Sequence, residues 1–92
     1  MSEQQWLNIF GSSLWLKMRE AGYFTQEEFA EDIGVSPATL SKYLNKTQMP
    51  GVKALINISY VLDWDLNELM DYGRMIDWKE FYVRRKLLYA SI

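Results

Sequence analysis

The 92-residue chain contains neither cysteine nor histidine. It therefore cannot form a disulfide framework, a thiolate or imidazole zinc site, a cysteine nucleophile or a histidine general base. Carboxylates remain, but pairs such as Asp63 with Asp65 are better explained as turn and capping residues than as metal ligands. The sequence predicts a protein that is not an enzyme and uses no metal or other cofactor.

Long apolar segments are also missing. No run approaches the roughly 18 apolar residues that a membrane span needs, and the N-terminus lacks the basic flank and apolar stretch of a signal peptide. With 49% hydrophobic residues, the chain has enough apolar side chains for one small core. We therefore expect a small cytoplasmic protein that makes no membrane contact.

Basic residues are outnumbered, and the net charge of -2, taken alone, argues against a nucleic-acid partner. The charges are unevenly distributed, however. Residues 1–35 and 61–73 each have a net charge of -4, whereas residues 36–60 contain three lysines and no carboxylate. An acid-free segment in an acidic chain is a candidate site for a polyanion, although a solvated lysine-bearing face gives the same pattern.

The spacing of apolar residues, with capping residues between the segments, predicts an all-α fold. The weak helix formers at residues 11–13 could break the first helix near its middle, and Gly73 is expected to break the chain after the fifth. The apolar face of the fourth helix is marked by Val52, Leu55, Ile58 and Leu62. The predicted helices lie within the segments 4–21, 25–33, 36–45, 52–62, 65–70 and 77–90.

The second and third predicted helices are short and close together. Thr25 and Glu28 form a capping-box pattern at the start of one, and Gly34 marks its end. Ser36 is a good N-cap for the other, and Pro37 suits the first helical position because its missing N–H has no partner there. This layout is typical of a helix-turn-helix, whose second helix enters the DNA major groove with small, polar and cationic side chains.

Several motifs stand in register with those of a known family. The stretch 25–36 (TQEEFAEDIGVS) is followed by 39–45 (TLSKYLN), by Pro50 and by 61–69 (VLDWDLNEL). Over residues 14–69 the chain resembles the Cro/CI-type (XRE) helix-turn-helix domains of phage repressors and their bacterial relatives. The resemblance implies a five-helix lambda-repressor-like DNA-binding domain, expected here at residues 1–70 with its motif at about 25–45.

The resemblance also implies DNA contacts. The residues expected to face base edges are Pro37, Ala38 and Lys42. Lys42 is the strongest of these, because a lysine can donate to guanine as well as to phosphate. Gln26 is expected to touch a phosphate and to brace the recognition helix, and Thr39 can serve either purpose. The expected DNA-binding residues are together Thr25, Gln26, Ser36, Pro37, Ala38, Thr39, Ser41, Lys42, Asn45, Lys46 and Lys53.

Three residues depart from the family pattern. Leu44 stands where many relatives have an acidic residue, which suggests an extra core contact. Lys46 and Asp63 each stand where many relatives have glycine. We expect the turn at Lys46 to accept its side chain with modest strain.

The segment 71–92 is a C-terminal extension that is expected to be helical. Five of the fourteen aromatic residues lie in positions 72–92. Their side chains either extend the core by packing against Trp6, Phe10 and Trp15 or form a dimer interface. The candidates for dimerisation are Trp78, Phe81, Tyr82 and Leu88.

These observations together predict a sequence-specific transcriptional regulator, a repressor that binds double-stranded DNA as a homodimer on a short palindromic operator. The alternative is a protein-interaction module, an accessory to or antagonist of another regulator that retains the fold. The acidic pI, near 5.0, favours that alternative.

Overall fold

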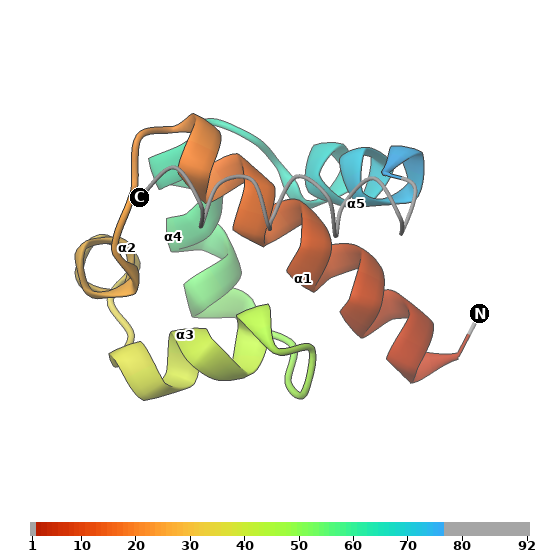
Figure 1. The fold of residues 1–92 in the computed structure, drawn as a ribbon, viewed down its shortest axis with the longest axis horizontal. Helices are drawn as coiled ribbons and strands as arrows, with labels where there is room; N and C mark the ends of the chain where they lie inside the picture. Colours follow the sequence, from red (N-terminus) through yellow and green to blue (C-terminus); the bar gives the residue numbers. More distant parts are fainter. Residues whose placement is uncertain (1, 77–92) are drawn as a thin grey trace.

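The computed structural model describes residues 2–76, and in this range the chain forms helices only (Figure 1). The all-α fold and the first five predicted helices are confirmed. The sixth predicted helix, with the dimerisation candidates Trp78, Phe81, Tyr82 and Leu88, lies outside the described residues. The helices are α1 (Glu3–Glu20), α2 (Gln26–Ile33), α3 (Pro37–Leu44), α4 (Val52–Leu62) and α5 (Leu66–Met75).

Helix α1 is the longest described element and lies at the centre of the fold (Figure 1). It packs against both α3 and α5, while α2 packs against α3 and α4. All five helices contribute to one hydrophobic core, whose fully buried members include Phe10, Leu14, Trp15, Phe29, Ile33, Leu40, Ile58 and Leu69. None of the helices in residues 2–76 is long and apolar enough to cross a membrane.

Two glycines allow helices to approach each other closely, and both correct the sequence prediction. Helix α1 continues unbroken through Gly11, which is buried where a Cβ atom would come within 2.9 Å of the Tyr43 carbonyl oxygen in α3. The prediction that Gly73 breaks the chain is wrong. Helix α5 continues through it to Met75, and a Cβ on Gly73 would overlap the carbonyl oxygen of Ile9 in α1. The first residues of the predicted extension 71–92 therefore belong to α5.

The apolar face of α4 differs from the one predicted. Ile58 and Leu62 are buried, but Val52 is 75% exposed. The helix carries a second apolar row, in which Ile56 and Tyr60 follow Val52 at intervals of four residues. Spacing alone could not distinguish the row that packs on α2 and the core from the row that faces outward.

Side chains cap the helix starts largely as predicted. The Ser36 hydroxyl accepts a hydrogen bond from the backbone N–H of Thr39 (3.1 Å), and Pro37 occupies the first turn of α3. At α5, Asp65 and Glu68 form both bonds of a capping box. At α2 the predicted capping box is only half formed, because Thr25 accepts from the backbone N–H of Glu28 without the reciprocal bond.

Four of the five described helices end in the same kind of turn. In each, a backbone N–H bonds to a carbonyl oxygen five residues earlier, at 2.9 to 3.2 Å, across a residue with positive φ, as in a Schellman motif. Glycine takes that position after α1 and α2 (Gly22 and Gly34), whereas Lys46 (φ 65°) and Asp63 (φ 54°) take it after α3 and α4. Lys46 and Asp63, which stand where many relatives have glycine, are thus the two non-glycine residues with positive φ in residues 2–76.

Candidate nucleic-acid interface

Helix α3 has sharply different inner and outer faces. Leu40, Tyr43 and Leu44 are buried against the core, at 0%, 4% and 3% exposure. The extra core contact suggested for Leu44 is therefore confirmed. Burial raises the pKa of the Tyr43 phenol. With its inner face fixed in this way, α3 presents its remaining residues to solvent.

Eight of the eleven expected DNA-binding residues lie on α3, at its N-cap or in the turn that follows it. Pro37, Ala38 and Lys42 are exposed, as expected for residues that face DNA, and Thr39 and Ser41 are half-buried. The Ser36 hydroxyl also donates to the Thr39 Oγ1 (2.9 Å), so these two side chains are engaged in the helix cap. The outer face therefore combines short side chains with one long cationic side chain, that of Lys42.

The turn after α3 is held by several hydrogen bonds. Asn45 donates its Nδ2 to the Ser41 Oγ (3.1 Å), and the Thr47 hydroxyl donates to the Lys42 carbonyl (3.1 Å). From α1, the Gln4 side chain donates to the Lys46 carbonyl (3.2 Å). These bonds fix where the exposed Asn45 and the partly buried Lys46 lie relative to α3.

Sequence reasoning missed Gln4 and Thr47 as residues that position this turn. Gln4 is 42 residues away from Lys46 along the chain, and no local pattern could pair them. The signal for Thr47 was present, since a hydroxyl just past a helix end can bond to its last carbonyl groups. Both side chains position the turn.

The other three expected residues come from neighbouring helices. Thr25 is the N-cap of α2 and accepts from Glu28 (3.3 Å), and Gln26, the first residue of α2, is partly exposed. Lys53 is exposed in the first turn of α4, whose N-cap is Gly51 and has no side-chain capping bond. The starts of α2 and α4 therefore offer backbone N–H groups as well as side chains, an arrangement that favours anions.

The charged side chains change sign at the turn between α2 and α3. Helix α2 exposes four carboxylates, those of Glu27, Glu28, Glu31 and Asp32, while the segment from α3 to Tyr60 has none. Asp32 accepts a hydrogen bond from the Tyr23 hydroxyl. That bond is the main cause, with burial second, of a raised pKa for Tyr23. The three lysines of residues 36–60 thus lie on α3, in its turn and at the start of α4, with no carboxylate among them.

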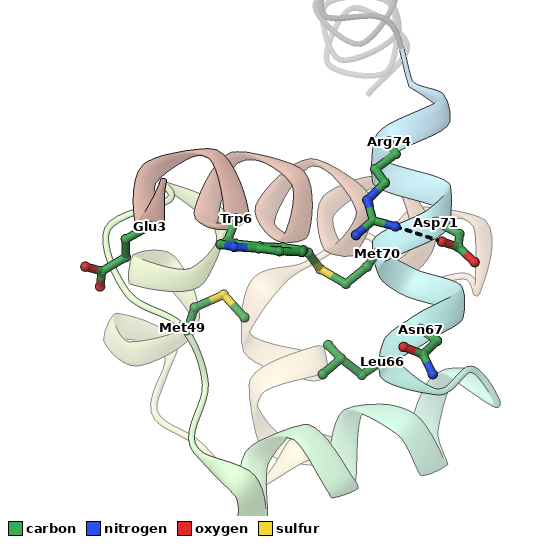
Figure 2. A pocket seen from close by; sticks show the side chains of 8 residues that line it. All are labelled: Glu3, Trp6, Met49, Leu66, Asn67, Met70, Asp71 and Arg74. Atoms are coloured by element: carbon green, nitrogen blue, oxygen red, sulfur yellow. Dashed lines mark hydrogen bonds and ion pairs between the residues drawn. The ribbon is translucent and has the colours of Figure 1, made fainter. Parts of the chain in front are cut away.

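A groove with an apolar floor is formed by the start of α1, by α5 and by the loop that precedes α4 (Figure 2). Its volume is about 620 Å³, and Trp6, Met49, Leu66 and Met70 converge on it. The Arg74 guanidinium lies 5.3 Å from the Trp6 ring centroid and is bonded to Asp71 (3.2 Å). None of the expected DNA-binding residues lines this groove, and residues 2–76 hold no cluster of side chains suited to a metal ion.

Comparison with known proteins gives one finding. A family model described as helix-turn-helix matches residues 16–69, from the second half of α1 to the middle of α5. The match includes all eleven expected DNA-binding residues. No curated protein and no solved structure matches the chain.

Proposed function

The chain belongs to the helix-turn-helix family that it matches and is a DNA-binding transcription regulator of the XRE type; from this premise we propose that it is a repressor, binding as a homodimer to a short palindromic operator. The observation that carries the proposal is the outer face of α3. It is acid-free, exposed and made of short side chains around Lys42. Repression would follow from occupation of a promoter by the bound dimer.

Helix α3 supplies base recognition in this proposal. The major groove is roughly 12 Å wide and admits a helix whose leading side chains are small. Pro37 and Ala38 meet this condition at the start of α3, so the helix end can approach the base edges. One turn later, the Lys42 ammonium can donate to guanine O6 or N7. Ser41 lies beside Lys42 and contacts the flank of the site.

The surrounding residues hold α3 in register through phosphates. Gln26 and Thr25 present the start of α2 to the backbone on one side, and Asn45 with Lys46 follow α3 on the other. Lys53 adds a cation at the start of α4. Such contacts supply affinity and orientation but no sequence preference. Two copies would place their α3 helices about 34 Å apart on successive turns of DNA, which requires a palindromic site.

Selection from a random duplex pool tests the proposal. The purified protein is incubated with the pool near 150 mM salt, and the retained DNA is sequenced. We expect an enriched palindrome whose half-sites are centred one helical turn apart. In a parallel selection, Lys42→Ala should change the preferred bases within each half-site.

A charge-matched control separates base recognition from general loss of positive charge. Lys17 is not one of the expected DNA-binding residues and lies on α1 with its Nζ 4.0 Å from the Trp64 ring centroid. Lys17→Ala should therefore retain the wild-type motif. If the wild-type protein enriches no motif and binds only weakly and uniformly at low salt, the proposal is wrong and the protein-interaction module becomes the better explanation.

A further inference from the structure

A row of apolar side chains runs along the outer face of α4. Val52, Ile56 and Tyr60 follow one another at intervals of four residues, which places them on one side of the helix. They are 75%, 51% and 81% exposed. Single exposed apolar residues are ordinary, but a contiguous row of large ones indicates a surface that binds another macromolecule.

This row continues onto the start of α5. A second groove, of about 630 Å³, lies between α4 and the start of α5 and is lined by Val52, Ile56, Tyr60 and Leu66 among others. Leu66 is 41% exposed and also lines the first groove, where Figure 2 shows it beside Met70. The exposed apolar surface therefore consists of Val52, Ile56 and Tyr60 on α4 and Leu66 on α5; we refer to it as the α4–α5 face.

Charges of opposite sign lie at the two ends of the α4–α5 face. Lys53 adjoins Val52 at the start of α4, whereas Asp65 and Glu68 flank Leu66 at the start of α5. Lys53 forms no ion pair within residues 2–76. The two carboxylates accept their capping bonds through Asp65 Oδ1 and Glu68 Oε1. One end thus offers an apolar residue with a cation, and the other an apolar residue with two anions.

We propose that the α4–α5 face binds a second copy of this chain, in a two-fold contact that lays Val52 of each protomer on Leu66 of the other. Lys53 of each copy then meets the partner's carboxylates at the start of α5, and Ile56 lies next to the two-fold axis. An isologous interface must contain both halves of every contact on one surface, and this face does. The inference rests on the proposed function, since a palindromic operator requires a dimer, and it identifies the surface that forms that dimer.

Lys53 keeps its proposed phosphate contact in this arrangement. Its ammonium carries three donors, so one can bond to a partner carboxylate while another reaches DNA. Residues 45–51 connect the end of α3 to the start of α4. The proposed interface therefore adjoins the DNA-binding surface without covering the outer face of α3.

Disulfide trapping tests the interface directly, because the natural chain has no cysteine and each variant carries a single thiol. A residue next to a two-fold axis meets its own copy at the short distances that a disulfide needs. In Ile56→Cys, mild oxidation without DNA should convert most of the protein to a covalent dimer. Glu27→Cys, on the exposed outer face of α2, is the matched control and should stay largely monomeric under the same conditions.

A second variant measures the strength of the contact. Ile56→Lys would place two ammonium groups against each other at the axis, so the dimer dissociation constant should rise about a hundredfold or more in sedimentation experiments. Glu31→Lys, which adds a lysine to the exposed face of α2, should leave that constant within about threefold. Both variants should keep the wild-type helix content by circular dichroism, because both positions are exposed.

The outcomes separate this inference from the proposed function. If the wild-type chain is a dimer but Ile56→Cys is trapped no more than Glu27→Cys, the interface is wrong, and a palindrome selected from the DNA pool would still support the function. If the wild-type chain is monomeric and Ile56→Cys is not trapped, both the interface and the homodimer fail. Selective trapping together with the effect of Ile56→Lys supports the interface, whatever the DNA selection gives.

Discussion

Helices α3 and α4 have similar inner faces and contrasting outer faces. Leu40 and Leu44 anchor α3 in the core, and Ile58 and Leu62 do the same for α4. Outside, α3 shows small polar side chains and Lys42, whereas α4 shows the row Val52, Ile56 and Tyr60. Two neighbouring helices of one small domain therefore meet solvent with opposite chemistry.

This contrast separates the requirements of folding from those of binding. The buried residues of both helices are interchangeable in kind, since any well-packed aliphatic set stabilises such a core. The outer residues contribute little to the monomer and determine what each helix can bind. A polar, cationic face suits the major groove, and an apolar face suits protein. Substitutions on the outer face of α3 should therefore leave dimerisation of the free protein intact.

The largest expected effect compares two isoleucines of α4. Ile58 is fully buried and Ile56 is 51% exposed. Ile58→Ala removes packed core atoms and should lower the free energy of unfolding by about 2–5 kcal/mol. Ile56→Ala should lower it by less than about 1 kcal/mol at protein concentrations below the dimer dissociation constant. Urea denaturation of both variants at several protein concentrations measures this.

The concentration series makes this prediction sharper. In the proposed dimer, Ile56→Ala should cost more stability as protein concentration rises, because association stabilises the folded state by mass action. The loss of unfolding free energy caused by Ile58→Ala should change much less with protein concentration. A large, concentration-independent loss for Ile56→Ala would mean that the outer face of α4 is packed within one chain, and the contrast between the two faces would fail.

Salt should act very differently on the two binding surfaces. With about six phosphate contacts per dimer, DNA affinity should fall about a thousandfold between 50 and 200 mM salt. The α4–α5 face is mainly apolar, so its dimer dissociation constant should change only a few fold over that range. Fluorescence anisotropy with labelled operator and sedimentation of the free protein provide the two measurements. A dimer as salt-sensitive as the DNA complex would indicate that charge, not apolar contact, holds the protomers together.

The sequence predicted the region around α2 and α3 well because its signals are local. Ser36, Pro37 and Gly34 each determine backbone geometry within a few residues of themselves, and the structure has them in the predicted roles. The buried and exposed sides of α3 followed from spacing for the same reason. Only one side of that helix is apolar, so periodicity gave a single answer.

Other features depended on partners far away in the chain. Helix α4 is apolar on two sides, and the packing of α2 and the core decides that Ile58 is buried and Val52 is not. Gly73 has the local signature of a helix breaker, but it lies where α1 approaches α5, and a side chain there would overlap Ile9. The bond from Gln4 to the turn after α3 has no signature in either segment. Long-range packing, not local propensity, determined these features.

Lys42→Ala tests whether the two outer faces act independently. Losing a base contact should weaken operator binding by about 1–3 kcal/mol, which is roughly 5- to 150-fold, and should relax the preference at one position of each half-site. The free-protein dimer dissociation constant should stay within about twofold, because Lys42 lies on the outer face of α3. Equal weakening on all DNA sequences would show instead that Lys42 contacts a phosphate.

The smallest expected effects compare the turns after the two helices. Lys46 and Asp63 both adopt left-handed backbone conformations that favour glycine. Asp63→Gly should raise the free energy of unfolding by about 0.5–1 kcal/mol without changing DNA affinity. Lys46→Gly should raise it less, because the Lys46 side chain lies over Gly11, where an added Cβ would come within 2.7 Å of the Lys46 Cγ. Thermal or urea denaturation of the two variants measures the difference.

The variants Lys46→Gly and Asp63→Gly also distinguish the roles of the two turns in DNA binding. Lys46→Gly keeps the backbone conformation but removes a proposed phosphate contact, so DNA affinity should fall equally for all sequences. The slope of log affinity against log salt concentration should become shallower by about one unit. Asp63→Gly should leave that slope unchanged. If Lys46→Gly were as stabilising as Asp63→Gly and bound DNA with the wild-type slope, Lys46 would have neither a packing nor a phosphate role. Its place in the DNA-binding set would then have to be withdrawn, while Lys42 and the rest of α3 would still be tested by their own variants.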